Sequence, residues 1–208
     1  MQIIYRGAES VIYLDEVDGQ KVLVKDRIPK KYRLQEIDSK LRKTRTRKEV
    51  KLLNESRKFG VQTPAVLQVD ETKARITMEF IAGIRLKEFL NSAKDNKIQK
   101  VCFEIGRLVG KLHANGIVHG DLTTSNMILK DQEIFLIDFG LGEFSKRIED
   151  QGVDLNLLQE AIKSTHFNIL DMAWENILKG YNQEYSNAKK VLEKVEEIEK
   201  RARYAQRK

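Results

Sequence analysis

The chain has only one cysteine, Cys102, among its 208 residues. A single thiol cannot form a disulfide bond within the chain, so a fold stapled by disulfides is excluded. Cys102 lies among apolar residues with helical spacing, which predicts a small buried side chain. A protein without disulfides is typical of a reducing compartment, and we therefore expect a cytoplasmic location.

Long apolar runs are also missing from the sequence. No run approaches the ~20 residues that a helix needs to cross a bilayer, so we expect no membrane association. The first six residues, Met-Gln-Ile-Ile-Tyr-Arg, turn polar too early for a secretory signal peptide. Internal repeats and low-complexity linkers are absent as well. The length indicates one large domain or two small lobes with a hydrophobic core.

Acidic residues are fewer than basic residues. The 38 Lys and Arg residues exceed the 31 Asp and Glu residues, which gives a formal net charge of +7. The excess is clustered in residues 40–48 and 201–208. Such clusters are typical of surfaces that bind an acidic partner, such as RNA, DNA, a nucleotide or an acidic protein. Each cluster is equally compatible with a solvated helix face, and both interpretations stay open.

The most specific pattern is His119-Gly-Asp-Leu-Thr-Thr-Ser-Asn126, followed by Asp138-Phe-Gly140. Two apolar runs and a polar turn connect these motifs, which predicts a β-hairpin between them. Asn126 and Asp138 would then sit at neighbouring strand ends and offer hard oxygen ligands to Mg²⁺. Asp121 stays free to face an acceptor hydroxyl or a water molecule. The pattern therefore predicts a site for Mg²⁺ and a polyphosphate.

The N-terminal part predicts a three-stranded antiparallel meander. Short strands are expected at 2–5, 11–14 and 20–25, and Asp18-Gly19 is a hairpin turn signal between the last two. The sheet should then form one half of the molecule.

The connection between the first two strands, residues 6–10, contains a single glycine. Gly7 permits a tight turn, so backbone N–H groups of Gly7, Ala8 and Glu9 can approach phosphate oxygens. An ordinary hairpin is the alternative, since only the position two strands ahead of Lys25 favours phosphate contact. Lys25 ends an apolar Val-Leu-Val run and needs a partner or ligand there, and we predict the α- and β-phosphates of ATP.

A long helix is expected over about residues 37–59, with Gly60 as its stop signal. The helix carries two candidate partners for Lys25, namely Glu49 and Glu55. We favour Glu49 because it lies beside the packed face of the helix. Glu49 would hold the lysine toward the phosphates.

A second hairpin is expected from residues 65–70 and 75–80, after which the chain leaves the sheet toward Gly83. A linker here would join two lobes, and backbone groups of Glu79 and Ile81 could bond the edge of an adenine. A plain connection from strand to helix is the alternative.

The rest of the chain predicts mainly helices, apart from the hairpin between the motifs. The helices are expected at 85–92, 98–115, 153–164, 174–181 and 187–203, and the hairpin strands at 127–130 and 133–137.

The combined pattern resembles the motifs of the protein-kinase superfamily. It consists of Lys25, Glu49, Asp121, Asn126 and Asp138. The similarity is closer to the family of the small atypical, RIO-like kinase of the KEOPS complex and covers essentially the whole chain. The segments that carry it are Gly7-Ala-Glu9, Lys43–Glu49, His119–Asn126 and Arg201-Ala-Arg-Tyr204.

The resemblance implies an α+β, minimal bilobal kinase-like fold, with an antiparallel sheet and one helix in an N-lobe (about 1–81) and a mainly helical C-lobe (about 82–208). It implies ATP and Mg²⁺ as cofactors, Asp121 as catalytic base, and autophosphorylation. It also implies as partners the synthase subunit that makes threonylcarbamoyladenosine at position 37 of tRNA, and other KEOPS subunits. The basic segments 40–48 and 201–208 are then expected to contact tRNA.

The sequence departs from ordinary protein kinases in three ways. Gly120 stands where an arginine usually precedes the catalytic Asp, and Thr123 stands where many protein kinases have a lysine. An Ala-Pro-Glu element is absent, and only about a dozen residues separate Asp138 from the next expected helix. These departures disfavour phosphorylation of peptides in trans and leave ATP hydrolysis, or phosphorylation of a docked partner or of the chain itself, as the expected activity.

Two alternatives compete with an ATP-dependent phosphotransferase or ATPase. The chain could be mainly a binding module in which the nucleotide is structural. It could also be a small-molecule kinase of the aminoglycoside or choline type, although the short C-terminal part argues against the helical insert that such enzymes need.

Overall fold

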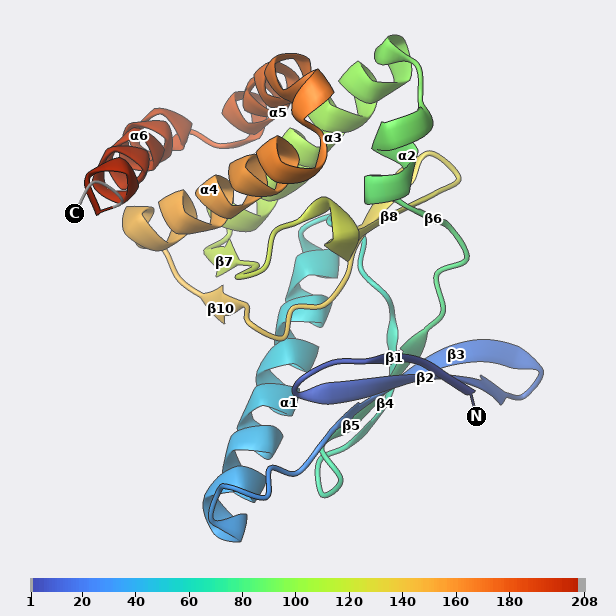
Figure 1. Ribbon diagram of the computed structural model, residues 1–208. Coiled ribbons are helices and arrows are strands. Elements are labelled where there is room, and N and C mark those ends of the chain that lie inside the picture. The colour runs from blue at the N-terminus through green and yellow to red at the C-terminus, as the bar shows by residue number, and fades with distance from the viewer. Residues whose placement is uncertain (1, 206–208) are drawn as a thin grey trace.

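The computed structural model describes residues 2–205, with side chains through residue 202. Of the basic segment predicted at 201–208, residues 206–208 and the side chains of residues 203–205 therefore lie outside the described part of the chain. An antiparallel sheet and one long helix form the N-lobe, and helices dominate the C-lobe (Figure 1). The predicted α+β class with two lobes is confirmed.

Five antiparallel strands form the N-lobe sheet in the order β1-β2-β3-β5-β4. Their bounds are β1 Gln2–Arg6, β2 Ser10–Val17, β3 Gln20–Arg27, β4 Val66–Asp70 and β5 Arg75–Glu79. At the β2–β3 turn, φ is 50° at Asp18 and 77° at Gly19, as a tight two-residue hairpin requires. Strands β2 and β3 exceed their predicted lengths because the ladder continues through polar residues that carry no apolar signal.

Helix α1 (Gln35–Lys58) connects the two lobes. Its C-terminal end enters the helical lobe, where Leu52 and Leu53 join the main hydrophobic core (Figure 1). Its middle turns bury Glu49 against the sheet. Gly60 follows with a φ of 74°, the left-handed conformation that ends many helices, so the predicted stop is confirmed.

The C-lobe alternates helices with very short strands. Its elements are β6 Ile84–Arg85, α2 Leu86–Ser92, α3 Asp95–Ala114, β7 Ile117–Val118, a 3₁₀ turn Thr124–Asn126, β8 Met127–Lys130, β9 Glu133–Leu136, β10 Glu143–Phe144, α4 Ile148–Thr165, a 3₁₀ turn Phe167–Ile169, α5 Leu170–Glu184 and α6 Ala188–Ala205. None of the helices within residues 2–205 is long and apolar enough to span a bilayer.

Helix α4 begins five residues before the predicted position 153. Its first turn contains Glu149 and Asp150, and carboxylates at that end are stabilised by the unpaired backbone N–H groups. Asp150 also accepts a hydrogen bond from the hydroxyl of Ser145 at 2.5 Å. Polar residues therefore start this helix, and the apolar pattern used for the prediction appears only later.

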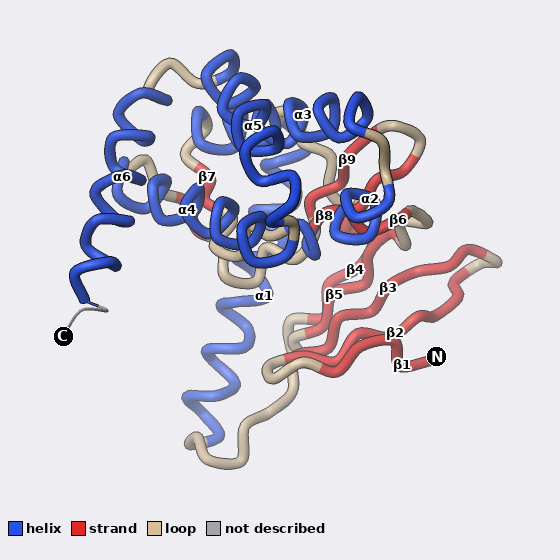
Figure 2. Tube along the Cα trace, turned by 45° about the horizontal axis from the view of Figure 1, so that its top comes forward, coloured by secondary structure: helices blue, strands red, loops and turns tan. Residues whose placement is uncertain are grey.

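Helices α3 and α5 pack with their backbones in contact (Figure 2). A Cβ atom on Gly106 would lie 1.9 Å from the carbonyl oxygen of Ile177, and one on Gly180 would lie 2.0 Å from that of Phe103. Cys102 in α3 is fully buried in this core, as predicted. The close packing joins α3 and α5 into one unit of the C-lobe.

The hairpin between the two sequence motifs is confirmed. Strands β8 and β9 pair from Met127↔Leu136 to Lys130↔Glu133, and β6 adds a third strand. A separate two-stranded ladder joins β7 and β10. Strands β6, β7 and β10 were not predicted because two residues are too few for an alternating pattern.

Candidate active site

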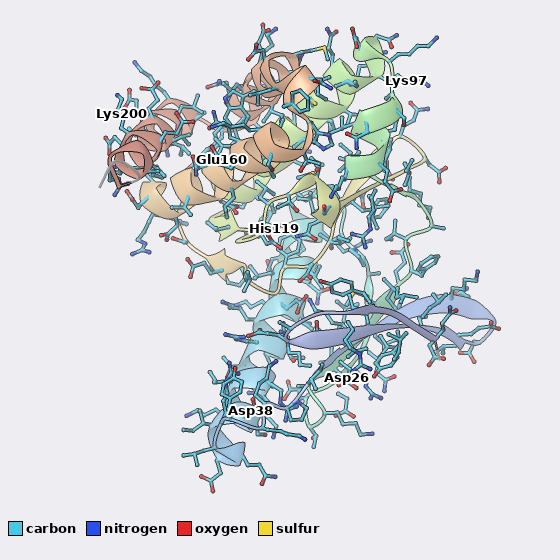
Figure 3. The ribbon with its side chains drawn as sticks, in the orientation of Figure 1. Asp26, Asp38, Lys97, His119, Glu160 and Lys200 are labelled. Carbon is cyan, nitrogen blue, oxygen red and sulfur yellow. The ribbon has the colours of Figure 1, made fainter. Side chains whose placement is uncertain are left out.

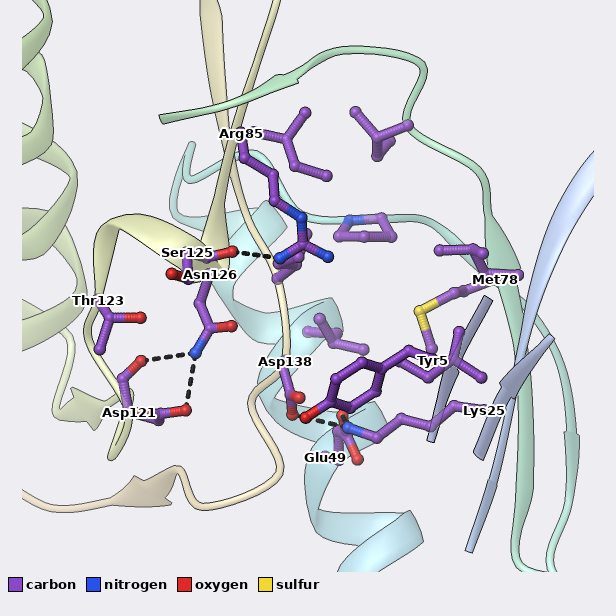
Figure 4. A pocket seen from close by; sticks show the side chains of 17 residues that line it. Tyr5, Lys25, Glu49, Met78, Arg85, Asp121, Thr123, Ser125, Asn126 and Asp138 are labelled. Atoms are coloured by element: carbon purple, nitrogen blue, oxygen red, sulfur yellow. Dashed lines mark hydrogen bonds and ion pairs between the residues drawn. The ribbon is translucent and has the colours of Figure 1, made fainter. Parts of the chain in front are cut away.

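A pocket of about 360 Å³ lies between the two lobes (Figure 4). Both lobes contribute polar groups to it, including Lys25 and Glu49 from the N-lobe and Asp121, Asn126 and Asp138 from the C-lobe. Its apolar lining consists of Ile12, Leu23, Leu53, Pro64, Met78, Ile81, Ile128 and Ile137. The pocket can therefore hold a ligand with a flat apolar part and a highly charged part.

Lys25 links two carboxylates on the sheet side of the pocket. Its Nζ donates to Glu49 Oε1 at 2.6 Å and to Asp138 Oδ1 at 2.7 Å. Burial alone would lower the pKa of Lys25, but the two carboxylates outweigh it and raise that pKa above its usual value. Burial likewise works against the charge on Asp138, yet Lys25 holds the pKa of Asp138 below its usual value. Lys25 and Asp138 are therefore both charged near neutral pH.

Asp138 has an unusual backbone conformation, with φ at 63°. This left-handed conformation costs a residue with a side chain about 1 kcal/mol, and such outliers concentrate at functional sites. A hydrogen bond from Gly140 N–H to Asp138 Oδ1 at 3.2 Å helps to fix the carboxylate. The carboxylate lies between Lys25 and Asn126 (Figure 4).

Asp121 and Asn126 form a second group on the opposite side of the pocket (Figure 4). Asn126 Nδ2 donates to the backbone oxygen of Asp121 at 3.0 Å and to its Oδ2 at 2.8 Å. This assigns the amide orientation, because the nitrogen faces Asp121 and the Oδ1 atom is directed into the pocket. Asn126 thus holds the Asp121 carboxylate and still offers a hard oxygen to a cation.

The loop of residues 119–126 is bonded to Asp154 of helix α4. The Asp154 side chain is buried, with the residue 1% exposed. Its carboxylate accepts backbone hydrogen bonds from His119 and Gly120, both at 2.8 Å. It also lies 3.2 Å from His113 Nε2, and His113 Nδ1 in turn lies 2.8 Å from the Tyr181 hydroxyl. These contacts hold the pKa of Asp154 below its usual value, against the opposing effect of burial.

His119 lies in the middle of the molecule, on the side of the C-lobe that faces the sheet (Figure 3). Its ring is buried, contacts the Phe139 ring at a centroid distance of 4.4 Å, and lies 3.1 Å from the Ile137 carbonyl oxygen through Nε2. The two sequence motifs are therefore packed against each other through His119. We infer a structural role for His119.

Gly120 has a physical reason to be glycine. Its φ is 79°, and a Cβ atom there would lie 2.4 Å from the Leu141 carbonyl oxygen. The sequence showed only that the usual arginine is absent. The structure adds that the backbone of this loop touches the segment after Gly140, which leaves no room for a side chain.

The loop between β1 and β2 borders the pocket but does not line it. Gly7 N–H donates to the Ser10 carbonyl oxygen at 2.9 Å, which closes the turn. Ala8 accepts a hydrogen bond from Lys30 through its carbonyl oxygen, and Glu9 forms an ion pair with Arg45 of α1. The carboxylate of Glu9 is therefore directed to the helix.

The predicted hinge residues differ in their placement. Ile81 is 4% exposed and lines the pocket. Glu79 ends strand β5, and its backbone N–H donates to the Ala65 carbonyl oxygen at 2.8 Å. Its carboxylate accepts from the Ala65 N–H at 3.2 Å, so this side chain is directed away from the pocket. The neighbouring Met78 side chain lines the pocket instead.

Sequence reasoning missed several site residues. Tyr5 of β1 places its ring in the pocket beside Lys25 and Asp138 (Figure 4), although the sequence marks it only as part of a short strand. Arg85 also lines the pocket and donates to the Ser125 carbonyl oxygen at 2.7 Å. Asp154 was missed because it lies 33 residues after Asp121 in an unremarkable helical segment. None of these residues belongs to a local motif.

Comparison with known proteins identifies the family of the chain. The family model of the RIO domain matches residues 19–141. The chain is 49% identical to the KEOPS complex subunit Bud32 of Pyrococcus abyssi, and the alignment covers 100% of this chain and 98% of that protein. It is 47% identical to a probable bifunctional tRNA threonylcarbamoyladenosine biosynthesis protein of Methanosarcina acetivorans, over 96% of this chain and 35% of that protein. The chain thus spans about a third of that longer relative.

Among solved structures, the fold is similar to that of WaaP in complex with acyl carrier protein. The TM-score is 0.63, the sequence identity is 17%, and the match covers 96% of this chain and 88% of WaaP. At this identity the likeness concerns the fold alone. The family model and the full-length relative go further, and the chain belongs to the RIO-domain family and, within it, to the family of the KEOPS complex subunit Bud32.

Proposed function

We propose that the chain binds Mg²⁺ and ATP in the pocket between the lobes and acts as an ATPase or atypical serine/threonine kinase that supports threonylcarbamoyladenosine formation on tRNA. The main support is that Lys25 and Glu49 from one lobe face Asp121, Asn126 and Asp138 from the other across one pocket. Autophosphorylation is part of this proposal.

The donor set fits Mg²⁺. Among residues 2–205 there is no cluster of three or more His, Cys, Asp or Glu side chains that could hold a metal by itself. Mg²⁺ fits such a sparse site, because it is usually held by one or two protein oxygens together with substrate phosphates and water. Asn126 Oδ1 and the Asp138 carboxylate would hold the ion, and the charge of the bound ion would neutralise negative charge at the phosphates.

Each remaining polar residue then has a distinct role. Asp121, fixed by Asn126, would accept the proton of the attacking hydroxyl or water. Lys25 would contact the α- and β-phosphates and exclude water from them, and Glu49 would orient its ammonium group. The backbone of Gly7, Ala8 and Glu9 would cover the phosphates from the sheet side.

The apolar part of the pocket suits an adenine ring. Leu23, Met78, Ile81 and Ile137 provide flat apolar contacts at the end where the chain passes from one lobe to the other. Backbone groups of Glu79 and Ile81 would bond the adenine edge, and we place the division between the lobes there, near residues 81 and 82.

The relatives' names support a place in an assembly. The Pyrococcus abyssi relative is a KEOPS complex subunit, and the bifunctional relative carries about two thirds of its length outside the part that matches this chain. We propose that the synthase that makes threonylcarbamoyladenosine is the direct partner, together with other KEOPS subunits. Transfer RNA would contact the basic residues 40–48 and the segment 201–208.

The proposal is tested by ATP turnover of the purified chain, alone and with partner subunit and tRNA. We expect Asp121→Ala and Asp138→Ala to lower turnover by about 10²–10⁴-fold, because each removes a base or a metal ligand. Both variants should unfold at nearly the wild-type temperature, since neither side chain lies in the core. Wild-type turnover in both variants would contradict the assignment.

A second function, binding without turnover, is favoured by one observation. Lys40, Lys43 and Arg47 line one shallow groove on the outer face of α1. Spacings of three and four residues place cations on one helix face, which suits a row of phosphates. Affinity for tRNA that falls steeply with salt, with no ATP turnover in any combination, would favour this function over catalysis.

A further inference from the structure

Arg27 forms a second cationic contact to Glu49. It is the last residue of β3 and follows Lys25 by two positions, so both side chains lie on the same face of the sheet. Arg27 Nη2 donates to Glu49 Oε2, while Lys25 occupies Oε1. Each carboxylate oxygen of Glu49 therefore has its own cation, and both Arg27 and Glu49 are at least 95% buried.

The guanidinium of Arg27 lies under the turn that follows Asp138. A Cβ atom on Gly140 would lie 3.5 Å from Arg27 Nη2 and 3.4 Å from Lys25 Nζ. Arg27 is not among the residues that line the pocket, and its buried Nε has no hydrogen-bond partner. The side chain is thus close to the reacting groups without touching the space for a ligand.

We propose that Arg27 is a positioning residue that fixes Glu49 so that Lys25 can exchange Asp138 for phosphate oxygens. The inference rests on the nucleotide-binding function proposed above. The cluster contains two cations, Lys25 and Arg27, and two carboxylates, Glu49 and Asp138. When the Asp138 carboxylate binds Mg²⁺ in place of Lys25, Glu49 must keep the ammonium group of Lys25 in position.

Without Arg27, one buried oxygen of Glu49 would lose its partner. A buried carboxylate with an unpaired oxygen is costly, so Lys25 would be drawn to satisfy both oxygens of Glu49. Lys25 would then be less available to phosphates. Arg27 removes this competition and leaves one oxygen of Glu49 for Lys25.

The test is titration of a fluorescent ATP analogue with Mg²⁺ into wild type, Arg27→Met and Arg27→Lys. We expect Arg27→Met to weaken binding about tenfold and Arg27→Lys to recover most of the loss, because contacting residues couple at this level. The matched control is Arg75→Met, which removes the 2.5 Å ion pair with Asp26 in the same sheet, and neither residue lines the pocket. This control should bind like wild type.

A double-mutant cycle with Glu49→Gln separates positioning from direct contact. If Arg27 acts through Glu49, Arg27→Met adds little further loss in the Glu49→Gln background. An undiminished tenfold loss there, or wild-type affinity of Arg27→Met alone, overturns the inference. Absence of nucleotide binding by the wild type overturns the proposed function and this inference with it. Thermal unfolding is measured in parallel, and Arg27→Gln replaces Arg27→Met if the latter is unfolded at the assay temperature.

Discussion

The two sides of the pocket are held by different forces. On the sheet side, Lys25 connects Glu49 and Asp138 through direct ion pairs that a charged ligand can rearrange. On the helical side, Asp121 belongs to a loop whose backbone is bonded to the buried carboxylate of Asp154. The difference indicates that the sheet side adapts to the ligand while the helical side stays fixed. The following predictions test that contrast, from the largest expected effect to the smallest.

The largest effect is expected for Asp154→Ala. The change leaves the N–H groups of His119 and Gly120 and the ring of His113 without their buried acceptor. We expect a loss of about 4 kcal/mol in the free energy of unfolding, measured with chemical denaturant, because removing one member of a buried polar network is strongly destabilising.

Glu160→Ala on the same helix is the matched control. Glu160 pairs with Lys163, both side chains are exposed, and such surface pairs contribute little. A loss in Asp154→Ala no larger than that in Glu160→Ala would remove the contrast between the two sides.

Gly120→Ala should have the next largest effect. The added Cβ combines a left-handed φ with a 2.4 Å approach to the Leu141 carbonyl oxygen, and we expect a loss of about 3 kcal/mol. Gly19→Ala is the control, because Gly19 has a similar φ of 77° but no atom within 4 Å of the added Cβ. It should lose about 1 kcal/mol by the same unfolding measurement. Equal losses in Gly120→Ala and Gly19→Ala would mean that the loop of residues 119–126 can move away from Leu141.

The smallest effect concerns pH. His166 is buried, and its ring nitrogens lie 3.0 Å from Thr124 Oγ1 and 2.8 Å from Asn91 Oδ1. Burial, with a contribution from Lys87, lowers the pKa of His166 below its ordinary value of 6.5. The unfolded chain therefore binds this proton more readily, and stability should fall as the pH drops below about 6.5.

This pH effect is measured as the unfolding midpoint between pH 8 and pH 5. His166→Gln keeps polar contacts to the loop and should reduce the slope in that range. If the unfolding midpoint of His166→Gln changes with pH as steeply as that of the wild type, another group causes the pH dependence. The helical side would then not be held through His166.

Most of the fold could be predicted from the sequence because its elements have clear patterns. Apolar spacing located α1, α3 and α6 to within three residues at each end, and turn residues located the hairpin at Asp18-Gly19. The start of α4 was misplaced because polar residues form its first turn. Strands of two residues, such as β7, are defined only by hydrogen bonds to a partner strand, here β10. Two residues are too few to show the alternating pattern of a strand in the sequence.

The site could be predicted only where it coincides with motifs. The sequence supplied Asp121, Asn126 and Asp138 together, and the choice of Glu49 over Glu55 agrees with the observed ion pair to Lys25. Tyr5, Arg27 and Asp154 reach the site from separate elements, so their roles depend on tertiary packing.

The continuous helix α1 has a mechanical consequence. Its N-terminal half carries the exposed Lys40, and Glu49 follows on the same helix, about 14 Å further along the axis at ~1.5 Å per residue. Because Leu52 and Leu53 anchor the far end in the C-lobe, a tilt imposed at Lys40 must pivot near them and displace Glu49. A macromolecule bound at the basic residues 40–48 and a ligand bound in the pocket would then each change the affinity of the protein for the other, by equal factors.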